Sequence, residues 1–138
     1  MIDFIELLYR QHKQLRQIAE VMWNENNDVH LTNSEWYMLK NIGAGSVTVP
    51  ELVHQLDISK QGVHKFILSL QEKGLITTEL KKGSKVQKIC YVTQKGEEII
   101  QRSKAMELEI EQMVRGTIGD QEYELLLEML KKPFLKMQ

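Results

Sequence analysis

The stretch TVPELVHQLDISKQGVHKFILSLQEKGLITTELKKGSKVQKICYVT, residues 48–93, decides the fold. It opens on Thr48-Val49-Pro50-Glu51, where a threonine and a glutamate three residues later form a capping box and the proline occupies the first helical turn. A short helix ending near Leu56 is therefore predicted. Asp57-Ile58-Ser59 then reads as a tight turn, and Ser59 is a good N-cap for a second helix.

The second half of this stretch predicts a helix followed by a β-hairpin. Apolar residues at spacing i, i+3, i+4 and i+7 describe one buried helix face: Val63, Phe66, Ile67 and Leu70. Gly74 supplies the left-handed residue that ends this helix after Lys73. Two β-prone runs, Leu75–Leu80 and Ile89–Thr93, flank the polar, glycine-containing segment 81–85 and indicate a hairpin.

Two more helices are expected upstream. Residues 2–23 carry an amphipathic stripe with a helical period, and the polar run 24–28 is expected to break that helix. Thr32-Asn33-Ser34-Glu35 is a further capping box. The helix that it starts should bury Trp36 and Leu39 and end at the glycines near residue 43.

Two helices are also expected downstream of the hairpin. From Thr93 the helical period returns, with Ile99, Met106 and Met113 seven residues apart, up to Gly116 or Gly119. We expect Asp120 to cap a last helix, which Pro133 stops.

Three short helices followed by a basic hairpin are the order of a winged helix-turn-helix. The predicted fold is thus mainly α with a small β-wing, in a single unit over residues 1–138. Residues 29–96 form the winged helix-turn-helix DNA-binding region, and residues 1–28 and 97–138 form N- and C-terminal dimerisation helices. A chain of 138 residues fits one such unit.

The outer helices carry more apolar surface than a compact winged domain can cover, which favours a homodimer. The alternative is that these helices fold back within one chain. The predicted interface residues are Phe4, Ile5, Leu8, Met106, Ile110, Met113, Tyr123, Leu126, Leu127 and Leu130.

The charges are segregated along the chain, although the net charge is only −1. Residues 54–95 hold eight lysines against three acidic residues, a net charge of +5, and each flank carries −3. A basic centre on the predicted helix and hairpin is the electrostatic footprint expected for a nucleic-acid partner.

The side chains on the exposed side of the helix after Ser59 are mostly polar or short. A helix N-terminus offers free N–H groups to phosphate, Gln61 can bond a base edge, and Lys65 can reach guanine or the backbone. Gly62 costs about 1 kcal/mol of helix propensity relative to alanine, which suggests close approach to DNA or neutral drift. The predicted DNA-binding residues are Thr48, Ser59, Lys60, Gln61, Gly62, His64, Lys65, Lys81, Lys82 and Lys85.

The order and spacing of these elements resemble the MarR family of bacterial transcription regulators over essentially the whole chain. The matching stretches are Leu31-Thr32, Val49–Leu52, Ser59–Leu70, Glu72–Ile76 and Thr93–Gly96, of which the last two are the most specific. The resemblance implies an intertwined homodimer on a pseudo-palindromic operator, acting as a repressor released by a small ligand or by oxidation. It also implies an effector crevice between the dimer helices and the winged domain, to which Tyr9, His12, Trp36 and Tyr37 would contribute.

The wing tip departs from the family pattern. The family's acidic-then-arginine signature is replaced by Ser84-Lys85-Val86, so Lys85 occupies the place of the arginine that enters the minor groove. Lysine neutralises phosphate but lacks the planar, multi-donor fork of arginine. Weaker, less A·T-selective minor-groove binding is therefore predicted.

Cys90 is the single cysteine, which fits a reducing cytoplasm and excludes an intrachain disulfide. It lies in a predicted wing strand, whereas the family's peroxide sensors place their reactive cysteine near the first helix. We therefore expect Cys90 to be an inert small hydrophobe.

Other function classes find little support. The four histidines are scattered without metal-ligand spacing, so we expect no metal and no cofactor. The chain shows no nucleophile motif, phosphate-binding glycine loop or paired carboxylates, which argues against an enzyme. The longest apolar run is four residues, so neither a membrane span nor secretion is expected. The main alternative to a DNA-binding regulator is a winged-helix protein-interaction adaptor that does not bind DNA.

Overall fold

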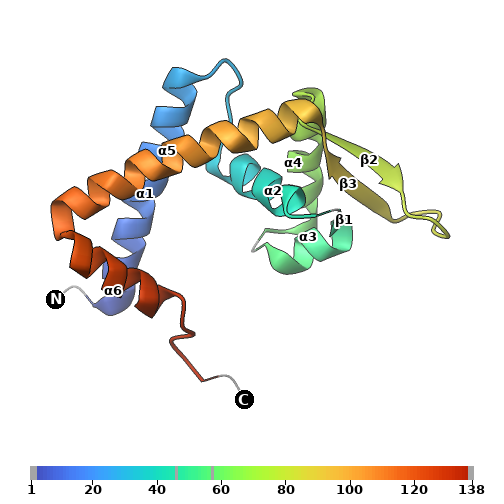
Figure 1. The fold of residues 1–138 in the computed structure, drawn as a ribbon. Helices are drawn as coiled ribbons and strands as arrows, with labels where there is room; N and C mark the ends of the chain where they lie inside the picture. Colours follow the sequence, from blue (N-terminus) through green and yellow to red (C-terminus); the bar gives the residue numbers. More distant parts are fainter. Residues whose placement is uncertain (1–2, 46, 57, 137–138) are drawn as a thin grey trace.

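The computed structural model describes residues 3–45, 47–56 and 58–136, and it shows a winged-helix unit flanked by long outer helices (Figure 1). The elements in chain order are α1 (Phe4–Asn26), α2 (Asn33–Gly43), β1 (Val47–Thr48), α3 (Val49–Gln55), α4 (Lys60–Glu72), β2 (Ile76–Leu80), β3 (Lys88–Val92), α5 (Gln94–Ile118) and α6 (Asp120–Leu130). Helix α5 crosses the molecule, with the β2–β3 hairpin at one end and α6 at the other (Figure 1). The predicted fold class is confirmed.

Helices α2, α3 and α4 enclose the core together with a three-stranded antiparallel sheet. The strand order is β1-β3-β2, with Ile76 opposite Val92 and Val47 opposite Cys90. Met38, Leu52 and other fully buried side chains from these elements form one cluster. Strand β1 was not predicted, because two residues are too few to show an alternating sequence pattern. It is defined only by its pairing with β3.

Capping side chains start several of the helices, and Thr32 does so as predicted. The hydroxyl of Thr32 accepts the N–H of Glu35, whose carboxylate accepts the N–H of Thr32 in return. Thr48 accepts the N–H of Glu51 at 3.3 Å, but among the described residues Glu51 does not accept the N–H of Thr48, so the predicted capping box is only half formed. The hydroxyl of Thr93 caps α5. The predicted turn at Asp57 lies outside the described residues.

Two glycines join the winged region to α5. Gly74 has a φ of +75° and lets the N–H of Leu75 reach back to the carbonyl of Leu70 at 3.0 Å, which closes the end of α4. Gly96 lies against the start of β2, where a Cβ atom would stand 2.2 Å from the carbonyl oxygen of Leu75. Only glycine permits this close packing of α5 on the sheet.

Two predicted helix boundaries shift. The polar run 24–28 ends α1 as predicted, but the helix extends to Asn26, and asparagine side chains bond carbonyls in its last turn. The amides of Asn26 and Asn27 donate to the carbonyls of Met22 and Trp23, one turn earlier. At the other end of the chain, the cap of α6 is Gly119, with a φ of +102°, rather than Asp120. Asp120 is the first helical residue.

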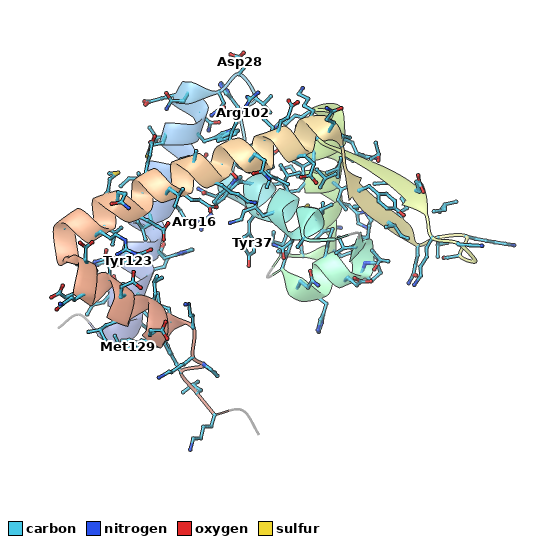
Figure 2. The ribbon with its side chains drawn as sticks, viewed as in Figure 1. Arg16, Asp28, Tyr37, Arg102, Tyr123 and Met129 are labelled. Carbon is cyan, nitrogen blue, oxygen red and sulfur yellow. The ribbon has the colours of Figure 1, made fainter. Side chains whose placement is uncertain are left out.

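A polar cluster fixes the bend between α5 and α6. Arg115 pairs with Asp120 and with Glu124 and lies over the ring of Tyr123, 4.3 Å from its centroid. The hydroxyl of Tyr123 donates to Glu111 at 2.5 Å. Figure 2 shows Tyr123 where α5 meets α6. The hydrogen bond to Glu111, with a smaller contribution from burial, raises the pKa of Tyr123, since each disfavours the phenolate.

Candidate nucleic-acid interface

Helix α4 is positioned by its apolar face. Val63, Ile67 and Leu70 are buried as predicted, and Phe66 packs against the core from its edge. The hydroxyl of Ser59 accepts the N–H of Gly62 at 3.1 Å and so starts the helix. The polar positions predicted for this helix consequently face solvent: Lys60, Gln61, His64 and Lys65.

Packing within the chain explains why residue 62 is a glycine, which the sequence did not suggest. A Cβ atom there would stand 2.6 Å from Cγ2 of Ile58 and 3.2 Å from Oγ of Ser59. Glycine therefore allows Ile58 to pack against the first turn of α4. Neither DNA approach nor neutral drift is needed to explain this residue.

The wing tip is a tight, lysine-rich turn. The N–H of Lys81 donates to the carbonyl of Gln87 at 2.7 Å, and Gly83 turns the chain with a φ of +84°. Oγ of Ser84 then accepts the N–H groups of Val86 and Gln87. These bonds occupy the backbone inside the turn, so the lysine side chains at 81, 82 and 85 point to solvent.

A groove of about 470 Å³ separates α4 from the wing. Its walls include Lys60, His64 and Leu68 from the helix and Val86, Gln87 and Lys88 from the wing. The amide of Gln71 donates to the hydroxyl of Thr78 at 3.0 Å and ties α4 to β2 along this groove. Lys60 and His64 were predicted from the sequence, but the three wing residues were not, because their proximity to α4 depends on how the hairpin folds back.

Thr48 differs from the rest of the predicted DNA-binding set. It is buried, its hydroxyl caps α3, and its backbone pairs with Ile89 in the sheet. The other nine residues are exposed or half-exposed. Thr48 therefore holds α3 beside the interface, and its direct contact with DNA remains a prediction.

The predicted effector residues are spread over two helices. Tyr9 and His12 lie on an exposed part of α1, and Tyr37 projects outward from α2 (Figure 2). Trp36 lines a small cavity together with Trp23, Leu31 and Met106. The ammonium of Lys40 stands 4.5 Å from the centroid of the Trp36 ring and 2.7 Å from the carboxylate of Glu107 on α5. A single chain does not bring the four residues into one pocket.

Cys90 is fully buried in β3, as expected. Burial raises the pKa of its thiol, although the nearby charge of Lys88 acts in the opposite direction. A protonated, inaccessible thiol is a poor nucleophile.

Within the described part of the chain, no group of three His, Cys, Asp or Glu side chains is placed to hold a metal ion. Among those same residues, no helix combines the length and apolar character needed to cross a membrane.

The fold of the chain, rather than its sequence, is similar to that of known proteins. No family model and no curated protein sequence matches the chain. Among solved structures, wild-type apo MarR from E. coli is similar with a TM-score of 0.84 and 17% identity, over 98% of this chain and 99% of that one. The chain has the MarR fold. S. aureus MepR, solved as a DNA complex, has the same fold with a TM-score of 0.77 and 17% identity, over 95% of each chain.

A third structure with this fold is an organohalide-sensing transcriptional regulator solved with bound 2,4-dichlorophenol. It aligns with a TM-score of 0.73 and 16% identity, over 95% of this chain and 79% of that one. Similar architecture at such low identity shows that the MarR fold tolerates almost complete replacement of its side chains.

Proposed function

We propose that this protein is a MarR-type transcription regulator that binds double-stranded DNA through α4 and the wing. One observation carries the proposal: α4 presents an unobstructed polar face beside a lysine-rich wing tip. Lys60, Gln61 and Lys65 lie on that face, in the helix that follows the turn of the helix-turn-helix. The MarR fold, shared with a protein solved on DNA, supports it.

The two parts of the surface suit different features of DNA. An α-helix fits the major groove, where a glutamine or lysine side chain can hydrogen-bond base edges. The exposed polar side chains of the wing tip are the lysines at 81, 82 and 85, whose amines suit phosphate contact rather than base readout. Sequence preference should therefore come mainly from α4, with the wing contributing affinity.

We further propose that the protein binds DNA as a homodimer through its outer helices. Phe4 is 62% exposed and Ile5 is 77% exposed on α1, and Leu125 and Leu130 are exposed on α6. Helix α6 packs on α5 through Tyr123 but leaves these leucines open, so folding back within the chain does not bury the stripe. A second copy would cover them, as apolar patches of this kind require. Two-fold symmetry then implies half-sites roughly 34–36 Å apart.

The regulator is proposed to act as a cytoplasmic repressor released by a small ligand. Support comes from the neighbour solved with 2,4-dichlorophenol. The cavity at Trp36, about 10 Å³ in volume, holds no more than a water molecule in this single chain. Tyr9, His12 and Tyr37 lie outside this cavity, so they would join an effector site only if the partner chain completes it.

Fluorescence anisotropy tests the DNA-binding proposal. The purified protein first selects duplexes from a random pool. It is then titrated against a selected duplex, against duplex DNA from immediately upstream of its own gene, and against a scrambled duplex. Measurements at about 50 and 200 mM salt should show a steep loss of affinity, because several phosphate contacts release counterions. Saturation at two chains per selected duplex is expected. Equal, weak binding to every duplex would instead favour the protein-adaptor function.

A further inference from the structure

Glu35 is a buried carboxylate whose bonds extend beyond its own helix. It stands in the first turn of α2 and is 4% exposed. One oxygen, Oε1, accepts the N–H of Thr32 and completes the capping box. The capping box needs only this oxygen, so the other oxygen is free to bond elsewhere.

The second oxygen, Oε2, binds the C-terminal end of α4. It accepts the hydroxyl of Ser69 at 2.7 Å and the ammonium of Lys73 at 2.6 Å. Lys73 also donates to the carbonyl of His30, in the loop between α1 and α2, at 2.8 Å. One carboxylate therefore joins the start of α2 to the end of α4 and to the preceding loop.

We propose that Glu35 is a positioning residue for DNA recognition, which sets the tilt of α4 relative to α2 through Ser69 and Lys73. The inference rests on the proposed DNA-binding function. Glu35 itself does not contact DNA; it acts through α4, whose N-terminal half bears Gln61 and Lys65.

The carboxylate suits this role because three donors meet on it, one of them the charged ammonium of Lys73. Burial by itself would raise the pKa of Glu35, but the bonds from Lys73, Ser69 and Thr32 and the charge of Lys73 together lower it. Glu35 is therefore ionised at neutral pH. Because the carboxylate is buried, water cannot easily replace these donors, so the arrangement that keeps them is favoured.

A bond at the C-terminal end of α4 affects the interface because the rigid helix acts as a lever. Ser69 lies eight residues after Gln61, or about 12 Å along the helix. A rotation of about 5° about Ser69 moves Gln61 by about 1 Å, which exceeds the spread of normal hydrogen-bond lengths. Base-edge contacts should suffer from such a shift, whereas flexible lysines can still reach phosphates.

The test compares binding to two duplexes by three variants. The duplexes are one selected from a random pool by the wild-type protein and a scrambled one of equal length. Glu35→Gln keeps the size of the side chain but removes the charge. Ser69→Ala removes a single bond on α4 with little risk to folding. The matched control is Glu107→Gln, which removes the other α2 ion pair, Lys40–Glu107 at 2.7 Å, directed to α5 and away from α4.

We expect Glu35→Gln to lose about tenfold in affinity for the selected duplex and less than about twofold for the scrambled one, since a good base contact has roughly this value in discrimination. Ser69→Ala should show the same selective loss at about threefold, and Glu107→Gln should leave both affinities within about twofold. Melting temperatures of all variants are recorded in parallel.

Equal losses on both duplexes, or identical behaviour of Glu35→Gln and Glu107→Gln, would overturn the inference. If Glu35→Gln does not fold, an unchanged selectivity of Ser69→Ala overturns it instead. A wild-type protein that enriches no duplex from the pool would refute the DNA-binding function itself, and the positioning role with it.

Discussion

Two glycines in α5 provide a matched experiment on how this helix joins the winged region. At Gly96 a Cβ atom would meet the carbonyl oxygen of Leu75 at 2.2 Å and Cγ1 of Val92 at 2.6 Å. The carbonyl of Leu75 cannot easily move, because it accepts the N–H of Thr93 at 3.0 Å. At Gly116, in the same helix, no such atom lies within 4 Å.

Alanine should therefore have opposite effects at the two positions. Gly96→Ala gains up to about 1 kcal/mol of helix propensity but suffers an overpacking cost of about 1–3 kcal/mol or more. Because the closest atom belongs to the backbone, the upper part of that range applies, and we expect a net loss of about 2 kcal/mol. Gly116→Ala meets open space and should gain a few tenths to about 1 kcal/mol, less than a central position because the helix end frays.

Urea denaturation followed by circular dichroism measures both changes at one fixed protein concentration, because dimer stability depends on concentration. For a chain of this length, 1 kcal/mol corresponds to a shift of about 2–5 °C in melting temperature. A Gly96→Ala variant as stable as the wild type would refute the reasoning. It would mean that α5 can slide away from β2 without loss, so that the close approach is not a constraint.

Further predictions concern pH, the wing, the dimer and the cysteine. Folding lowers the pKa of Glu35 from its ordinary value of 4.5. The stability that its carboxylate adds to the fold is therefore complete above pH 4.5 and is lost as the pH falls through the pKa of the folded state. Glu35→Gln should remove this loss and flatten the acid limb of a curve of stability against pH. Lys85→Ala should reduce the slope of log affinity against log salt by about 1, read by anisotropy, and an unchanged slope would remove Lys85 from the interface. Ile5→Glu or Leu130→Glu should shift sedimentation from dimer to monomer without changing the helical content, and a wild-type monomer at micromolar concentration would contradict the dimer. Cys90 should react with a thiol reagent only after denaturation, and rapid labelling of the native protein would show that the wing strand opens.

Local signals made much of the fold predictable. Thr32, Ser59 and Thr93 start their helices through hydrogen bonds that reach only three residues along the chain. Gly74 ends α4 through its own φ angle. The exposed set on α4 followed from the helical period once Val63 and Ile67 were assigned to the core. These features need no knowledge of the rest of the molecule.

Predictions failed where a helix cap or a strand depends on a partner that the residue pattern does not specify. Asp120 has the chemistry of an N-cap, yet its carboxylate lies 3.5 Å from the guanidinium of Arg115 and Gly119 takes the cap position. Strand β1 exists only through pairing with β3, some forty residues later. The asparagines after Met22 resemble a breaker in sequence but prolong α1 by capping its last carbonyls.

By itself, the sequence determined the order of the helices and the hairpin, most of the helix starts and the lysines that reach solvent, because caps, turns and periods act over a few residues. Tertiary structure alone decided the groove between α4 and the wing and the role of Glu35. That carboxylate meets Ser69 and Lys73 across 34 and 38 residues, and no local pattern records such a separation. The physical reason is that burial removes water as a competing partner, so a charge finds its donors wherever the packed helices bring them.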